Sequence, residues 1–137
     1  MSLFVEVALP VPMRQTFSYR VPESYPSTPQ IGVRVKVPFG RQQLIGLVTD
    51  ITESCSLAPK QIKSVLEFID DKPLLPESLY KLTLWAARYY FCSQGQMLTQ
   101  ALPVALRKGL DAAPQKIQFW QLTEIGQNIA PEAVKRA

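Results

Sequence analysis

Residues 31–50, which read IGVRVKVPFGRQQLIGLVTD, constrain the fold more than any other part of the chain. In the first half of this stretch, valines alternate with basic residues, in the order Val33, Arg34, Val35, Lys36 and Val37. A period of two places one face of a strand in a core and the other face in water. The pattern therefore predicts a half-buried strand whose outer face is cationic.

The second half of the stretch predicts the partner strand of a hairpin. Pro38 cannot donate a ladder hydrogen bond, so the first strand is expected to end there, and Gly40 is free to adopt the positive φ of a turn. The chain resumes at residues 44–49 as an apolar run, which is expected to be buried on both faces. The predicted tip, residues 39–43, carries a phenyl ring, bare backbone amides, a guanidinium and two carboxamides, which suit a nucleic-acid end.

Three further segments have the residue pattern of strands, at 4–9, 16–21 and 64–69. Loops rich in proline and serine separate them, above all at residues 22–32. Four or five short strands joined in this way would leave exposed edges unless the sheet curls. The chain is therefore predicted to form a small, partly closed antiparallel β-barrel.

After the strands, apolar residues recur at helical spacing, at Leu79, Leu82, Ala86 and Tyr89 or Tyr90. This spacing predicts an amphipathic helix over residues 76–91, with Gly95 just past its end and a shorter helix at 96–102. Trp85, Tyr89 and Tyr90 are predicted to form the face that packs on the barrel. The fold class is thus α+β.

The last part of the chain predicts the start of a second domain. Residues 107–116 have the composition of a linker, residues 117–122 the pattern of a strand, and Thr123 that of a helix N-cap. A strand and half a helix have no partner here, so residues 117–137 are expected to be the truncated beginning of a domain that follows a first domain at 1–106.

Composition excludes several kinds of protein. At 137 residues, with 47% hydrophobic and 19% charged residues, the chain is expected to be an ordinary folded domain with no membrane span. No signal peptide is recognisable, so a cytoplasmic location is expected. The absence of histidine and the presence of only Cys55 and Cys92 exclude zinc fingers and Cys/His dyads. No catalytic residues, cofactor or metal are predicted for this chain, and a disulfide between the cysteines is the less favoured interpretation.

Charge is distributed unevenly along the sequence. The formal net charge is +4, and residues 14–49 hold five bases against the single acid Glu23. Arg34, Lys36 and Arg41 are therefore predicted to contact phosphates, although a simple solvated strand face is the alternative.

Six short motifs stand in a fixed order: VALPVP at 7–12, TFSY at 16–19, GVRVKVPFG at 32–40, IG at 45–46, WAARYY at 85–90, and a stretch from Gly95 to the ALP of 101–103. In sequence and spacing, residues 5–106 resemble the amino-terminal domain of the PriA family of bacterial replication-restart DNA helicases. Residue 119 onward resembles the start of the winged-helix domain of that family.

The resemblance implies a domain that binds the 3′-terminal nucleotide of a DNA strand at stalled replication forks. It assigns the 3′-end pocket to Phe17, Ser18, Gly40 and Lys63. Ser18 stands where some relatives have an aspartate, and a neutral hydroxyl forgoes the stronger, charge-assisted hydrogen bond.

For the full-length parent, the resemblance implies an ATP-dependent 3′-to-5′ helicase that uses ATP, magnesium and zinc. It implies DNA as a partner, together with single-stranded DNA-binding protein and other primosome proteins, and a nucleoid-associated location without membrane contact.

Three alternatives stay open. Phe17 also has the pattern of an inward-facing core residue beside Tyr19 and Val21. The cationic face also suits a protein-docking module that receives an acidic tail of a replication partner, such as single-stranded DNA-binding protein. General single-strand binding without preference for ends is the third.

Overall fold

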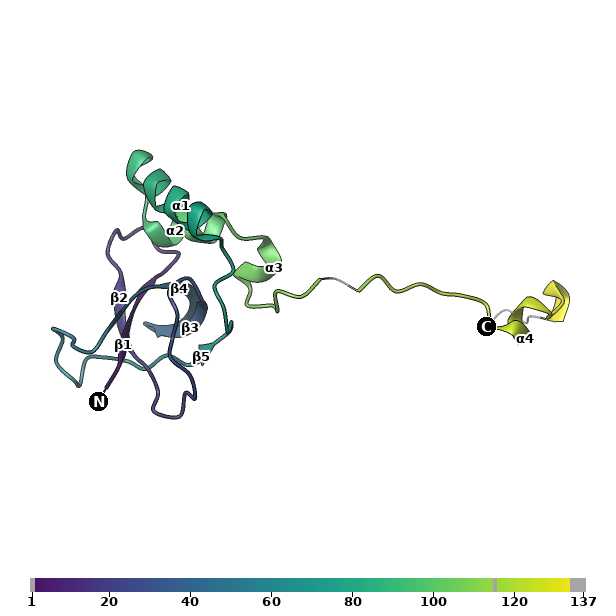
Figure 1. The fold of residues 1–137 in the computed structure, drawn as a ribbon, viewed down its shortest axis with the longest axis horizontal. Helices are drawn as coiled ribbons and strands as arrows, with labels where there is room; N and C mark the ends of the chain where they lie inside the picture. The colour runs from purple at the N-terminus through teal and green to yellow at the C-terminus, as the bar shows by residue number, and fades with distance from the viewer. Residues whose placement is uncertain (1, 115, 134–137) are drawn as a thin grey trace.

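The computed structural model describes residues 2–114 and 116–133, whose strands form one antiparallel sheet beneath a group of helices (Figure 1). The strands are β1 (Phe4–Ala8), β2 (Phe17–Arg20), β3 (Arg34–Phe39), β4 (Gln42–Thr52) and β5 (Glu67–Phe68). Their spatial order is β2-β1-β4-β3-β5. The predicted antiparallel α+β fold is confirmed.

The predicted partly closed barrel is wrong, because the described strands form an open sheet with β2 and β5 at its edges. The segment around β5 spans the gap with backbone hydrogen bonds. The N–H of Arg20 in β2 donates to the Lys63 carbonyl at 2.9 Å, and the N–H of Leu66 donates to the Lys36 carbonyl in β3, also at 2.9 Å. A single parallel bridge, between Arg20 and Ser64, joins this segment to β2.

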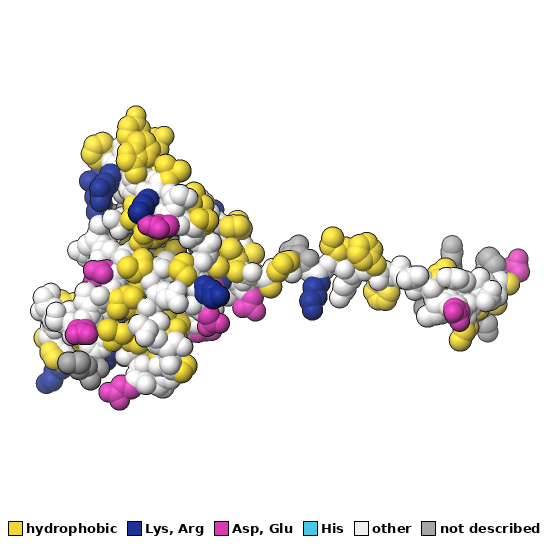
Figure 2. Space-filling view, viewed as in Figure 1, with side chains coloured by type: hydrophobic (Ala, Val, Ile, Leu, Met, Phe, Trp, Pro, Cys, Tyr) yellow, Lys and Arg dark blue, Asp and Glu magenta, His cyan; other side chains and the backbone are white. Residues whose placement is uncertain are grey.

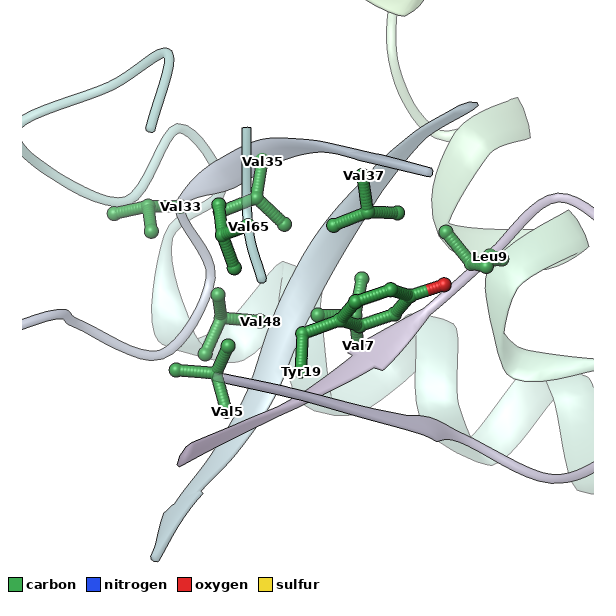
Figure 3. Packing of buried hydrophobic residues seen from close by; sticks show 9 residues of the cluster. All are labelled: Val5, Val7, Leu9, Tyr19, Val33, Val35, Val37, Val48 and Val65. Carbon is green, nitrogen blue, oxygen red and sulfur yellow. The ribbon is translucent and has the colours of Figure 1, made fainter. Parts of the chain in front are cut away.

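The core lies on the concave side of the sheet and consists mainly of valines (Figure 3). Its buried members are Val5, Val7, Leu9, Tyr19, Val33, Val35, Val37, Val48 and Val65. The predicted inward face of β3 is therefore correct. Tyr19 also links two strands, because its hydroxyl donates to the Pro38 carbonyl at 3.0 Å.

The β3–β4 hairpin turns more tightly than predicted. Phe39 pairs with Gln42, which leaves only Gly40 and Arg41 in the turn. Gly40 has a φ of +61°, as expected for a two-residue turn with glycine in its first position. The predicted end of the strand at Pro38 is wrong. β5 pairs only with Val35 and Lys36, so the missing N–H of Pro38 falls on an unpaired edge of β3.

Three helices follow the sheet: α1 (Glu77–Tyr89), α2 (Gln94–Gln100) and α3 (Val104–Arg107). Their buried faces meet the outer side of β1 and β4 in a second cluster, formed by Ala8, Leu47, Leu98 and Leu102. Tyr80 and Leu84 of α1 are half-buried against it. The two predicted helices are thus confirmed, with slightly different ends.

Gly95 does not end α1, as the sequence predicted, but lies within α2. A Cβ atom at this position would lie 1.7 Å from the carbonyl oxygen of Leu9, so only glycine permits this close packing of α2 on the end of β1. The position after α1 is occupied instead by Phe91, with a φ of +55°. Cys92 N–H then donates to the Ala87 carbonyl at 3.1 Å, which completes the helix end.

The predicted packing of Trp85, Tyr89 and Tyr90 on the barrel is wrong. Their exposed fractions are 55%, 62% and 67%. The helix presents Thr83 and Ala87 to the interior, and these are its buried residues. Both faces of α1 carry large apolar residues, so helical spacing alone does not identify the face that packs on the sheet.

Beyond α3 the chain runs as an extended segment away from the sheet, as far as α4 (Glu124–Gln127) and a short 3₁₀ turn at Pro131–Ala133 (Figure 1). Thr123 caps α4 as predicted, by accepting from the N–H of Gly126 at 3.2 Å. Residues 117–122 form no strand among the described residues, because no neighbouring strand supplies hydrogen bonds. The structure thus does not show the start of a winged-helix domain, and the proposed domain boundaries stay predictions.

In residues 2–114 and 116–133, no helix combines the length and apolar character needed to cross a membrane. Cys55 and Cys92 are both free thiols.

The position of Arg34 differs most from the sequence prediction. It was predicted to lie on a solvated face and contact phosphate, but its exposed fraction is 0%. Its guanidinium binds Asp70 through two bonds, Nη2 to Oδ1 at 2.7 Å and Nε to Oδ2 at 2.8 Å. Nη1 donates to the carbonyls of Leu106 at 2.7 Å and Leu110 at 2.9 Å. The chain after α3 therefore covers this part of β3.

Replacing Arg34 with methionine should lower the free energy of unfolding by about 3–5 kcal/mol, because the Asp70 carboxylate would stay buried without its partner. Urea denaturation measures the change. The exposed Arg41 offers a matched control, since Arg41→Met should alter stability by no more than about 0.5 kcal/mol. Adding Asp70→Leu to Arg34→Met should recover much of the loss. Equal losses of stability in Arg34→Met and Arg41→Met would contradict the structural role of Arg34.

Candidate nucleic-acid interface

A pocket of about 490 Å³ opens where the sheet is not closed, beside β2 and the β3–β4 turn. Three segments form its walls: residues 15–19, residues 38–40 and the loop that leads to β5. The lining residues are Gln15, Thr16, Phe17, Ser18, Tyr19, Pro38, Phe39, Gly40, Ser56, Leu57, Gln61 and Lys63. The four predicted pocket residues, Phe17, Ser18, Gly40 and Lys63, thus lie around one cavity.

Phe17 faces both the core and the pocket. It is half-buried and packs partly against the valine core, yet it also lines the cavity. Its ring meets that of Phe39 edge to face, with centroids 5.1 Å apart and planes at 81°. The core and pocket interpretations are therefore compatible, because a ring fixed by packing on one side can offer a flat surface on another.

The backbone of Ser18 lies on an edge of the sheet. The N–H and carbonyl of Arg20 point away from β1, since they bond to Lys63 and Val65. Backbone groups alternate sides along a strand, so the N–H and carbonyl of Ser18, two residues earlier, point the same way, toward the pocket. The edge therefore offers a ligand one backbone donor and one acceptor.

The side chain of Ser18 has a partner that sequence reasoning missed. Ser18 Oγ donates to Glu6 Oε1, and Thr16 Oγ1 donates to Glu6 Oε2 at 2.8 Å. Glu6 lies directly opposite Ser18 in the register of β1 and β2. Sequence alone does not reveal this partner, because only the register of β1 and β2 shows which residue Glu6 meets. The loop wall at Ser56, Leu57 and Gln61 was missed for a similar reason, since nothing in a loop sequence fixes its path.

Gly40 and Lys63 form the open side of the pocket. Both are exposed, and a Cβ atom added at Gly40 would have no neighbour within 4 Å. At the base, the Tyr19 hydroxyl joins the β2 and β3 walls through its bond to Pro38. Burial raises the pKa of the Tyr19 phenol, so this donor stays protonated at physiological pH.

The three predicted phosphate contacts do not lie together. Arg41 is exposed and directly follows Gly40 in the turn, so it stands at the rim of the pocket. Lys36 is half-buried, pairs with Glu67 of β5 and does not line the cavity. Arg34 is buried, as described above. Of the cations predicted to contact DNA, Lys63 lines the pocket and Arg41 follows the lining residue Gly40.

In chemical terms, the pocket offers an aromatic face, backbone hydrogen-bonding groups, a hydroxyl and two cations. This combination suits a nucleotide, which has a base to stack and phosphates to neutralise. Within the described part of the chain, no cluster of three or more His, Cys, Asp or Glu residues is arranged to hold a metal ion.

Comparison with known proteins gives the family. The sequence model of the PriA 3′ DNA-binding domain (3′BD) matches residues 6–103. The replication restart protein PriA of Haemophilus influenzae is 39% identical over 124 residues, which cover 90% of this chain and 17% of that protein. The PriA protein of Bacillus subtilis is 32% identical over 107 residues, covering 76% of this chain and 13% of that protein.

The match defines the class of the chain as a 3′BD-type domain with an antiparallel sheet and helices. The chain belongs to the PriA 3′ DNA-binding domain family, as its motifs predicted. It spans 17% of the length of the Haemophilus influenzae relative, about a sixth, so this family membership describes one part of such a protein.

Proposed function

We propose that this chain binds the 3′-terminal nucleotide of a DNA strand. The observation that carries the proposal is the pocket, where Phe17, the Ser18 edge, Gly40 and Lys63 come together in a domain of the 3′BD family. The terminal base stacks on the half-buried ring of Phe17, and the bare backbone at Gly40 lets the nucleotide approach closely. Lys63 and Arg41 neutralise the phosphate that precedes the terminal sugar.

A pocket favours an end over an internal nucleotide because of its shape. An internal nucleotide continues through a phosphate on its 5′ side and another on its 3′ side, so the strand must both enter and leave the pocket. A terminal nucleotide needs only one path for the strand. In the full-length parent, this capture would place an ATP-dependent 3′-to-5′ helicase at a stalled fork for primosome assembly and replication restart. ATP, magnesium and zinc would serve the parts of the parent outside this chain.

Replacing Phe17 with leucine should weaken binding of an oligonucleotide with a free 3′-hydroxyl by about 1–3 kcal/mol, because leucine keeps apolar volume but removes the flat ring. Fluorescence anisotropy measures the affinity, with a 3′-phosphorylated oligonucleotide alongside. Phe17→Tyr should retain binding. Phe68 is another half-buried phenylalanine beside the core, and Phe68→Leu controls for loss of packing. Equal binding of hydroxyl and phosphate ends by the unmodified chain would refute end recognition.

Changing Arg41 or Lys63 to glutamine should weaken binding to every sequence alike. Each change should also reduce the slope of log affinity against log salt by about 0.7, the value for one phosphate contact on a single strand. Titrations at several salt concentrations give the slope. Lys81, which pairs with Glu77 on the exposed surface of α1, supplies a control at which Lys81→Gln should leave the slope unchanged. A slope unaffected at Arg41 and Lys63 would exclude phosphate contact there.

A second candidate function rests on a different surface, at the end of α1. Trp85, Tyr89, Tyr90 and Phe91 form an exposed aromatic cluster there. Trp85 stacks on Tyr89 with centroids 5.0 Å apart, and Tyr89 meets Tyr90 edge to face at the same distance. Figure 2 shows hydrophobic side chains gathered at this end of α1, next to Lys or Arg side chains.

Arginine makes the aromatic cluster cationic as well as apolar. Arg14 donates to the Phe91 carbonyl at 2.9 Å, and its guanidinium lies 5.3 Å from the centre of the Phe91 ring. Phe91 itself keeps a left-handed backbone, which a bulky residue rarely adopts and which is concentrated at functional sites. An acidic tail with apolar residues would be complementary. We propose that a replication partner such as single-stranded DNA-binding protein docks here.

Trp85→Ala should weaken binding of a synthetic acidic tail peptide of single-stranded DNA-binding protein by about 2 kcal/mol, the typical loss at an aromatic hot spot. Binding of the 3′-hydroxyl oligonucleotide should not change. Anisotropy with labelled peptide and unlabelled oligonucleotide tests both expectations. Displacement of the peptide by the oligonucleotide would instead place the tail in the DNA pocket and contradict this site.

A further inference from the structure

We propose that Glu6 makes the pocket selective for a hydroxyl end. Glu6 accepts the proton of the Ser18 hydroxyl, so that Ser18 Oγ can act toward a ligand only as a hydrogen-bond acceptor. The proposal rests on the proposed 3′-end function and goes further, by assigning the group that distinguishes a 3′-hydroxyl from a 3′-phosphate. Glu6 is not among the lining residues of the pocket, but it accepts hydrogen bonds from Ser18 and Thr16, which are. It is a positioning residue.

The geometry around Glu6 fixes the direction of two hydrogen bonds. An ionised carboxylate only accepts, so the hydroxyls of Ser18 and Thr16 must both donate to it. A hydroxyl has one proton, and each of these two is engaged with Glu6. Ser18 and Thr16 both line the pocket, so to a ligand there their hydroxyl oxygens can offer only lone pairs.

A pair of acceptors backed by a negative charge selects for donors. A 3′-hydroxyl donates a proton, and the nearby carboxylate polarises Ser18 Oγ so that it accepts more strongly. A 3′-phosphate carries acceptor oxygens and negative charge, so it meets lone pairs and the field of Glu6 at the same place. Both effects favour the hydroxyl end.

The register explains why Glu6, among the nearby acids, has this role. Glu6 lies opposite Ser18 on one side and opposite Asp50 of β4 on the other. The Asp50 side chain is exposed and accepts from the N–H of Ile51 at 2.8 Å. Asp50 thus carries the same charge next to Glu6 but does not contact Ser18, which makes it a matched control.

The experiment measures the ratio of dissociation constants for 3′-phosphate and 3′-hydroxyl oligonucleotides. Glu6→Gln keeps the size of the side chain and removes its charge, and it should lower this ratio by about three- to tenfold, the difference between a charge-assisted and a neutral hydrogen bond. Asp50→Asn should leave the ratio unchanged. Ser18→Ala should lower the ratio, and adding Glu6→Gln to it should have little further effect, since Glu6 acts through Ser18.

Relocating the carboxylate provides a rescue. The double variant Glu6→Gln with Ser18→Asp carries one acidic acceptor at position 18 and should restore the preference for the hydroxyl end. A purely structural role of Glu6 would not be rescued in this way, and urea denaturation of each variant shows whether it is folded.

The outcomes separate the two proposals. If the unmodified chain shows no preference, the proposed 3′-end function fails. If it prefers the hydroxyl end and Glu6→Gln retains that preference, the role of Glu6 is refuted and the function stands. Equal losses from Glu6→Gln and Asp50→Asn would mean a general charge effect and would also refute the role of Glu6.

Discussion

The buried guanidinium of Arg34 is the interaction on which the arrangement of this domain depends. A charge removed from water must be matched by partners, and here these come from Asp70 and from the carbonyls of Leu106 and Leu110. Because the partners lie on the loop before α1, in α3 and just after α3, one side chain of β3 fixes these segments relative to the sheet. β3 leads directly into the Gly40 turn, so the same interaction steadies one wall of the pocket.

The pocket exists because the sheet stops short of closing. β2 is a four-residue edge strand, and only Arg20 at its end is paired with the segment that spans the gap. Further along, the backbone of Ser18 stays on an open edge, and the loop at residues 56–63 curves around it instead of pairing with it. A fully closed barrel would satisfy these groups internally and leave nothing for a ligand. The edge strand is only four residues long, which limits its pairing with other chains.

Sequence periodicity was informative where one face of an element is uniformly apolar. The valines of β3 are buried in the core as their period of two predicted. Periodicity failed at Arg34 and at Trp85. Alternation with valines indicates that Arg34 lies on the opposite side of the sheet from the core. It does not indicate whether a later segment of the chain covers that side. A helix with apolar residues on two faces does not show which face is packed, and the spacing at α1 selected the exposed one.

Glu6 shows a limit of a different kind. As one acidic residue among the apolar residues of a strand, it reads as an ordinary solvent-facing position. Its significance depends on the pairing of β1 with β2, which sets it opposite Ser18, 12 residues later, and brings Thr16 within reach. A neutral serine and a carboxylate one strand away then act as a single acceptor. The chemistry of a residue in a sheet is therefore a property of its cross-strand pair, and position 18 can be interpreted only together with position 6.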